Sequence, residues 1–114
     1  MEMNKITLCG STKFKKAFNE WNARLTLEGN VVYSVGLFGH QMKIFPSLEN
    51  KELLDRVHFK KIENSDEIFV LDVSGYIGES TRNEIEYATS IKKNVRYLSK
   101  EYPDWLEDDC EYTN

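Results

Sequence analysis

The sequence predicts an α/β fold, a small doubly wound domain in which a parallel sheet of four to five strands lies between two layers of helices. Two observations favour this class. Short apolar runs rich in β-branched residues alternate with segments of helical periodicity, a pattern typical of parallel sheets with right-handed crossovers. The length of 114 residues indicates one domain over residues 1–114, with an acidic tail at about residues 100–114.

The first half of the chain predicts two strands and one helix. Residues 6–9 form the first strand and residues 10–12 the turn after it. Four apolar residues then have the spacing of one helix face: Phe14, Phe18, Trp21 and Leu25. Gly29 ends that helix in the usual C-cap position. Residues 31–35 form a second strand, and residues 36–48 form a connection of the length that is usually functional.

The second half predicts two further strand–helix units. A helix over about residues 50–62 aligns three side chains: Leu54, His58 and Ile62. The third strand begins at Glu67, and the helix after its loop covers about residues 81–92. A fourth strand follows at residues 95–98, and the tail is expected to dock through Trp105. Together these elements predict a Rossmann- or flavodoxin-like three-layer sandwich.

Composition and charge argue against several classes of partner. The net charge is −4; residues 100–114, with one lysine and six acidic residues, sum to −5, which leaves +1 for the other 99 residues. A near-neutral body with an acidic tail argues against binding to a nucleic-acid polymer. No apolar run approaches the roughly 18 residues of a membrane span, and the start has no secretory pattern. Cys9 and Cys110 make neither a disulfide framework nor a metal-ligand cluster, so we expect a cytoplasmic protein without a metal.

Glu84 is the strongest candidate for a reactive group. It follows the third strand and its loop, near the start of a helix, and open α/β sheets bind their ligands at that edge. Spacing alone leaves two interpretations open. Thr81 and Glu84 match a capping box, in which Glu84 bonds back to the cap residue. Alternatively, Glu84 points into a cleft and attacks an electrophilic carbon, as carboxylates do in retaining glycosyl transfer.

The turn after the first strand is a candidate anion site. Backbone N–H groups at a helix start attract anions, and beside Gly10 the residues Ser11 and Lys13 add a hydroxyl donor and a positive charge. The alternative is a plain turn in which Ser11 or Thr12 caps the helix. The motif is neither a dinucleotide-binding fingerprint nor a P-loop.

Three further polar residues are candidates, each with a structural alternative. His58 either donates a proton to a leaving group or packs between Leu54 and Ile62. Asp72, at the end of the third strand, either orients a hydroxyl or caps the following loop. The Gln41 amide, in the long connection, either reads the edge of a base or belongs to the polar surface.

At these residues the sequence resembles the nucleoside 2-deoxyribosyltransferase superfamily, which includes the 2'-deoxynucleoside 5'-monophosphate N-glycosidases, over about residues 5–98. Residues 8–13 (LCGSTK) look like the first-strand motif of the monophosphate hydrolases, and residues 83–88 (NEIEYA) look like the family's Glu-containing helix start. The resemblance implies phosphate binding by Ser11 and Lys13 and makes Glu84 the nucleophile. It also puts Gln41 close to the base-contacting glutamine of the transferases.

The chain departs from the family pattern at three supporting positions. Thr7 stands where the family has a tyrosine in the first strand, and His58 where it has an aspartate on the second helix. Gly78 stands where the transferases have another aspartate, with Glu79 and Ser80 beside it.

The resemblance implies that the chain cleaves or transfers the N-glycosidic bond of a nucleoside or nucleoside 5'-monophosphate. Glu84 would attack C1' of the sugar, and His58 would protonate or hydrogen-bond the leaving base. The phosphate would be bound by three residues: Ser11, Lys13 and Ser80. Asp72 or Glu79 would orient the sugar hydroxyls. No metal or organic cofactor is needed, and family members are usually homodimers or larger homo-oligomers.

Two alternative functions stay open. The changed supporting residues are compatible with a nucleotide-binding module that has lost turnover. The third possibility is cleavage of an NAD-like dinucleotide, because the related Toll/interleukin-receptor-type NADases also use a Glu at a comparable place.

Overall fold

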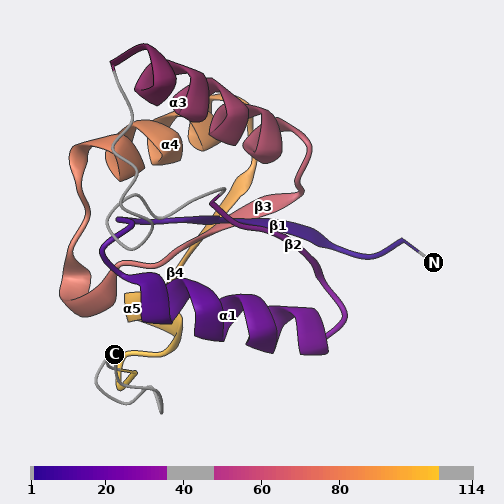
Figure 1. Ribbon diagram of the computed structural model, residues 1–114. Helices are drawn as coiled ribbons and strands as arrows, with labels where there is room; N and C mark the ends of the chain where they lie inside the picture. The colour runs from indigo at the N-terminus through magenta and orange to yellow at the C-terminus, as the bar shows by residue number, and fades with distance from the viewer. Residues whose placement is uncertain (1, 36–47, 106–114) are drawn as a thin grey trace.

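The computed structural model describes residues 2–35 and 48–105 of the chain (Figure 1). Strands and helices alternate in the order β1 (Lys5–Cys9), α1 (Lys15–Leu27), β2 (Val31–Tyr33), α3 (Leu48–Glu63), β3 (Glu67–Val70), the short 3-10 helix η1 (Val73–Gly75), α4 (Glu79–Ser90), β4 (Asn94–Tyr97) and α5 (Leu98–Glu101). No helix within these two ranges is long and apolar enough to cross a membrane.

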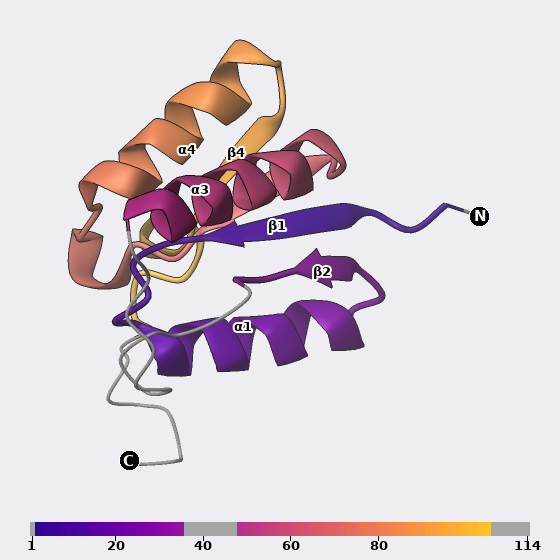
Figure 2. The same cartoon turned by 45° about the horizontal axis from the view of Figure 1, so that its top comes forward.

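The four strands of the described chain form one parallel sheet in the order β2-β1-β3-β4. Helices α3 and α4 cover one face of the sheet, and α1 and α5 lie on the other (Figures 1 and 2). The predicted fold class, a small doubly wound α/β sandwich, is therefore confirmed. Because β2 and β3 flank β1 on opposite sides, the loops after β1 and β3 diverge at the carboxyl edge, where such folds bind ligands.

The alternation of side chains along β1 divides the buried residues between the two faces of the sheet. Ile6 and Leu8 belong to the cluster on the α1 face. Thr7 and Cys9 point the other way, toward α3 and α4. The Thr7 hydroxyl donates a hydrogen bond to the carbonyl of Lys61 in α3 at 3.0 Å, and Cys9 is fully buried. The last residue of β1 therefore faces the helix pair α3 and α4.

Helix α1 agrees with the prediction from periodicity. Its buried residues are Ala17, Phe18, Trp21 and Leu25. Gly29 follows the C-cap residue Glu28 with a φ of +98°, a left-handed conformation that favours glycine.

The start of α4 differs from the prediction and removes one interpretation of Glu84. The helix begins at Glu79, with Gly78 as its N-cap, because the extended Gly78 already accepts a hydrogen bond from the Arg82 N–H at 2.9 Å. Thr81 is consequently buried within the first turn, and Glu84 lies in the second turn. The capping-box interpretation of Thr81 and Glu84 is therefore wrong.

The fourth strand ends one residue earlier than predicted, because α5 begins at Leu98. Asp72 fixes this helix start: its Oδ1 accepts a hydrogen bond from the Ser99 N–H at 2.9 Å and its Oδ2 accepts one from the Ser99 hydroxyl at 2.6 Å. After α5, Trp105 lies against Trp21, with ring centroids 6.1 Å apart.

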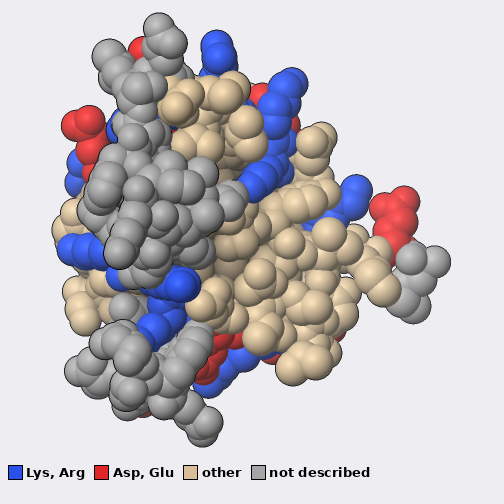
Figure 3. Space-filling view, in the orientation of Figure 1, with Lys and Arg blue, Asp and Glu red and all other residues tan. Residues whose placement is uncertain are grey.

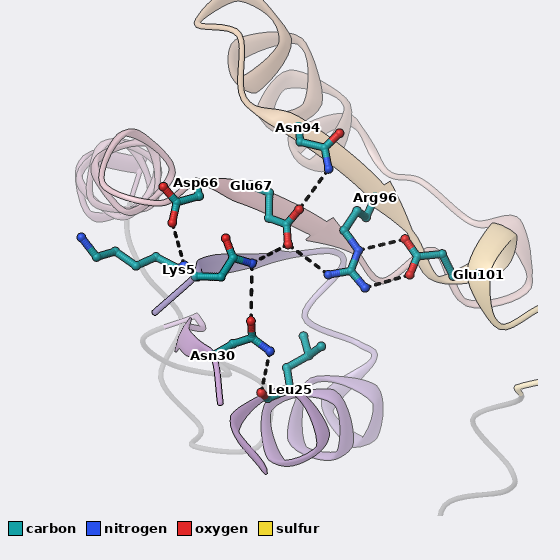
Figure 4. Close-up of polar contacts among 9 residues, drawn as sticks. Lys5, Leu25, Asn30, Asp66, Glu67, Asn94, Arg96 and Glu101 are labelled. Atoms are coloured by element: carbon teal, nitrogen blue, oxygen red, sulfur yellow. Dashed lines mark hydrogen bonds and ion pairs between the residues drawn. The ribbon is translucent and has the colours of Figure 1, made fainter. Parts of the chain in front are cut away.

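A polar network joins the strands around Glu67, which begins β3 (Figure 4). The Glu67 carboxylate accepts hydrogen bonds from Asn4 at 2.8 Å, Asn94 at 3.0 Å and Arg96 at 3.1 Å. Arg96 also donates two hydrogen bonds to Glu101 of α5, at 2.9 and 2.8 Å. The network therefore links the residue before β1 with β3, β4 and α5 at the amino end of β3, away from the carboxyl edge of the sheet.

Replacing Arg96 tests how much this network stabilises the fold. We expect Arg96→Met to lower the free energy of unfolding by about 1–2 kcal/mol, because it removes hydrogen bonds to two carboxylates that are only partly screened by solvent. Urea unfolding measures the change. Arg56→Met, an exposed substitution on α3, is the matched control, since the two residue types have similar helix propensity. A difference between the variants below about 0.5 kcal/mol would show that the network contributes little.

Candidate active site

Three side chains from distant parts of the chain meet where the carboxyl end of β1 faces the helix pair. Cys9 ends β1, His58 lies on α3 and Glu84 lies on α4. Cys9 Sγ is 3.6 Å from His58 Nε2, and His58 Nε2 is 4.0 Å from Glu84 Oε1. The sulfur, nitrogen and oxygen atoms all lie within 4.8 Å of one another. We call these three residues the Cys9–His58–Glu84 cluster.

The local sequence explains why the three side chains converge. Cys9 is one strand period after Thr7, so both face α3 and α4. His58 is one helical turn before the buried Ile62, and Glu84 is one turn before the buried Ala88. Both helices pack against each other and against the sheet, and they thus bring His58 and Glu84 over the end of β1.

One oxygen of the Glu84 carboxylate is buried and accepts no hydrogen bond within the described chain. The Glu84 side chain is 13% exposed, and its Oε1 atom accepts no hydrogen bond from any residue that the structure describes. Leaving a carboxylate oxygen buried and unpaired costs free energy, and buried polar groups of this kind are rare in folded proteins. The arrangement is thus typical of a functional group that is held ready for a ligand.

Burial shifts the pKa values of all three groups. It raises the pKa of Glu84 to about 7, although the Cys9 thiol opposes part of this shift. It lowers the pKa of His58 to about 4, and the charge of Lys61 acts in the same direction. Burial, followed by the charge of Glu84, raises the pKa of the Cys9 thiol well above its ordinary value. Near pH 7 the cluster therefore holds a thiol, a neutral imidazole and a carboxyl group that is about half ionised.

The structure keeps Asp72 apart from this cluster. Both of its carboxylate oxygens accept hydrogen bonds from Ser99, and the residue is buried at the junction with α5. The carboxylate thus holds the start of a helix.

The turn after β1 lies against the loop after β3 through Tyr76. The Lys13 ammonium lies 3.7 Å from the centroid of the Tyr76 ring, and the Ser11 hydroxyl accepts a hydrogen bond from the Lys13 N–H at 3.3 Å. Gly10 packs closely here: a Cβ would lie 3.2 Å from both the side chain and the carbonyl oxygen of Leu71, a tight contact. Phe14 is the N-cap of α1 and no side chain caps that helix, so the expected cap from Ser11 or Thr12 is wrong.

The other predicted binding residues begin α4. Gly78 is the N-cap of the helix, and Glu79 and Ser80 are its first two residues. The Tyr76 side chain lies next to Gly78, since a Cβ added there would be 3.4 Å from the Tyr76 hydroxyl. The ammonium of Lys51, from α3, lies 3.5 Å from the Ser80 hydroxyl. Gln41 lies outside the described residues.

Sequence reasoning missed two members of this region. The sequence assigns Cys9 no part in a disulfide framework or a metal-ligand cluster, although its place at the end of the first strand puts it at the carboxyl edge of the sheet. Lys51 gives no signal in the sequence, because its approach to Ser80 depends on how α3 packs on α4.

Charge and cavities elsewhere do not point to a second reactive centre. Figure 3 shows Lys and Arg side chains at several places on one face, some of them close together at the left of the view. A cavity of about 430 Å³ lies between α1 and the segment after α5, lined by Glu20, Arg24, Glu101, Tyr102, Pro103, Asp104 and Trp105. None of these residues belongs to the Cys9–His58–Glu84 cluster.

Comparison with known protein families and with curated proteins found no match to this chain.

Proposed function

We propose that this chain is an enzyme related to the nucleoside 2-deoxyribosyltransferases, which cleaves or transfers the N-glycosidic bond of a nucleoside or nucleoside 5'-monophosphate. The observation that carries the proposal is the buried Glu84 carboxylate, which has no hydrogen-bond partner among the described residues at Oε1 and lies beside a neutral His58. Its place at the carboxyl edge of a doubly wound sheet supports the same assignment. The removal of the capping-box alternative supports it further.

The reaction follows from the chemistry of these groups. The ionised Glu84 attacks C1' of the sugar, the C1'–N bond breaks, and its electron pair leaves with the base. The product is a glycosyl ester on Glu84, which water hydrolyses or a second base displaces. His58 is neutral near pH 7 and its ring is hydrogen-bonded to the Leu8 backbone, so it positions the leaving base without protonating it, and the base takes its proton from solvent.

The phosphate of a monophosphate substrate would bind between the loop after β1 and the loop after β3, which meet where Lys13 lies against Tyr76. Ser11 and Lys13 are on the loop after β1. Ser80 lies in the first turn of α4, where the loop after β3 ends, with Lys51 close to it. Two ammonium groups and two hydroxyls are suited to a phosphate dianion. Glu79, in the first turn of α4, is the remaining candidate to orient a sugar hydroxyl, since Asp72 is already hydrogen-bonded to Ser99.

Release of free base tests the proposal. The protein is incubated with purine and pyrimidine nucleosides, their 5'-monophosphates and NAD-like dinucleotides, and the base is measured by chromatography. Release from a nucleoside or monophosphate supports the proposal, and preference for the monophosphate supports the phosphate site. Release from the dinucleotide alone would favour the NAD-cleaving alternative. If no compound releases base, the proposed activity is wrong.

The pH dependence of base release follows from the carboxylate role. Because the nucleophile is the ionised form and the pKa of Glu84 is raised to about 7, kcat/KM should fall about tenfold per pH unit below pH 7 and level off above it. The profile is measured in the presence of a metal chelator. A rate that rises as the pH falls through 7 would instead make Glu84 a proton donor.

One observation favours a binding module without turnover as the second candidate. Thr7 stands where the family has a tyrosine, and Asp72 is a candidate to orient a sugar hydroxyl. Both are already hydrogen-bonded within the protein, to Lys61 and to Ser99. This candidate predicts that calorimetry detects nucleotide binding while the nucleotide is recovered unchanged. The resemblance also implies a homo-oligomer, which sedimentation analysis of the purified chain would test.

A further inference from the structure

The Cys9–His58–Glu84 cluster has the composition and spacing of a metal site. Zinc in proteins is bound by thiolate at about 2.3 Å and by imidazole nitrogen or carboxylate oxygen at about 2.0–2.1 Å. In a tetrahedron, these bond lengths separate sulfur from nitrogen by about 3.5 Å and nitrogen from oxygen by about 3.4 Å. The observed separations are 3.6 Å between Cys9 Sγ and His58 Nε2 and 4.0 Å between His58 Nε2 and Glu84 Oε1. The sulfur and the carboxylate oxygen lie within 4.8 Å of each other, against about 3.6 Å in a tetrahedron, so the carboxylate must move toward the sulfur by up to roughly an ångström.

The packing around the three side chains is also what a metal requires. The ligands come from β1, α3 and α4, which pack together, so the sulfur and the imidazole are held in place by the core. Glu84 is the partly exposed member, and its Oε1 atom has no hydrogen bond to lose within the described chain. A cation would give this buried oxygen the partner that it lacks there.

We propose that Cys9, His58 and Glu84 bind a zinc ion with one coordination position open to a further ligand. Three protein ligands with an open fourth position are typical of reactive rather than purely structural zinc. On binding, the Cys9 thiol releases its proton to solvent and its sulfur becomes the anionic ligand. The sequence alone leads us to expect no metal, because the three ligands are far apart in the chain and match no metal-binding spacing.

The inference does not depend on the proposed function, but the two interact. Zinc on the Glu84 carboxylate would occupy the electron pair that attacks C1', so zinc is expected to inhibit base release and a chelator to restore it. Metal binding is read out by spectroscopy without any substrate. A protein that binds metal but releases no base, and one that releases base but binds no metal, are therefore distinguishable.

The test is titration of tag-free, reduced protein with Co²⁺, followed by displacement with Zn²⁺. The chain has a matched control for each ligand type: its only other cysteine is Cys110, its only other histidine is His40, and Glu86 is exposed two residues after Glu84. We expect one equivalent of Co²⁺ to give a thiolate-to-cobalt charge-transfer band, which Zn²⁺ removes. Cys9→Ser should lose the band, while Cys110→Ser keeps it.

The other two ligands give the same contrast in affinity. His58→Gln and Glu84→Gln should each weaken Co²⁺ binding by about 100-fold or more. A residue that only supports a ligand from outside the coordination shell costs about 10- to 100-fold, so the larger loss indicates direct ligands. His40→Gln and Glu86→Gln should bind like the parent. Circular dichroism checks folding, and the His58 and Glu84 variants carry the test if Cys9→Ser does not fold. A parent spectrum equal to that of Cys9→Ser, or loss of the band in Cys110→Ser or His40→Gln, would overturn the zinc site.

Discussion

Glu84→Gln is expected to lower kcat/KM for base release by about 10³-fold or more. The substitution keeps the size and shape of the side chain but removes the anionic oxygen that attacks C1', and a loss of this order is typical when a nucleophile is removed. It corresponds to about 4 kcal/mol of transition-state stabilisation. Initial rates of base release, measured on the substrate that the panel identifies, give the ratio.

The matched control for this activity loss is Glu86→Gln on the same helix. Glu86 is exposed and carries the same charge, so its replacement should leave kcat/KM within about twofold of the parent, in line with the small effects of surface substitutions. If Glu84→Gln releases base as fast as Glu86→Gln, Glu84 is not the nucleophile.

The same Glu84→Gln substitution is expected to stabilise the folded protein by about 2–3 kcal/mol at pH 8. The pKa of Glu84 is raised from 4.5 to about 7 on folding, so the folded state binds a proton that the unfolded state has released between these values. Stability from this group is thus fully present below pH 4.5 and is lost as the pH rises through 7. A glutamine stays neutral, so Glu84→Gln does not lose this stability as the pH rises. Near pH 4, where Glu84 is protonated in both states, the variant and the parent should have the same free energy of unfolding.

His58 should show the opposite pH dependence. Its pKa is lowered from 6.5 to about 4, so its contribution to stability is present above pH 6.5 and is lost as the pH falls through 4. Between about pH 4.5 and 6.5 the two slopes oppose each other, and the parent's free energy of unfolding should depend little on pH through these two groups. Urea unfolding of the parent, Glu84→Gln and Glu86→Gln at pH 4, 6 and 8 measures these differences. A loss of stability in Glu84→Gln at pH 8 would show instead that Glu84 forms a stabilising ion pair.

Most of the fold was predictable because its elements are locally consistent. The apolar face of α1, from Phe18 to Leu25, repeats at helical spacing, and Gly29 marks its end with a positive φ. The alternation of such helices with short apolar strands then leaves few topologies other than a parallel sheet.

One of the two helix starts that differ from the prediction has a local cause, and the other depends on a contact between distant residues. The start of α4 at Glu79 follows from the extended Gly78, while Thr81 and Glu84 happen to have the spacing of a capping box. Likewise, α5 begins at Leu98 because Asp72, from the end of β3, binds Ser99. The Gly78–Arg82 hydrogen bond spans four positions, so only the contact between Asp72 and Ser99 lies outside a window of ten or so residues.

The sequence indicates two members of the candidate site, but neither Cys9 nor the cluster that the three residues form. Glu84 and His58 were singled out by residue type and position, yet their contact with Cys9 depends on how α3 and α4 pack over β1. The pKa shifts were also beyond the sequence, because burial causes them and burial is a property of the assembled fold.

Trapping the glycosyl ester tests the central claim, that Glu84 is the nucleophile, most directly. The protein is mixed with a 2'-fluorinated analogue of the substrate, because fluorine at C2' destabilises the positive charge that develops at C1' and slows hydrolysis of the adduct. Intact-mass and peptide mass spectrometry then locate the added sugar. We predict one sugar, with or without its phosphate, on the peptide that contains Glu84 in the parent and in Glu86→Gln, and none in Glu84→Gln. An adduct on another residue, or one that persists in Glu84→Gln, would contradict the assignment.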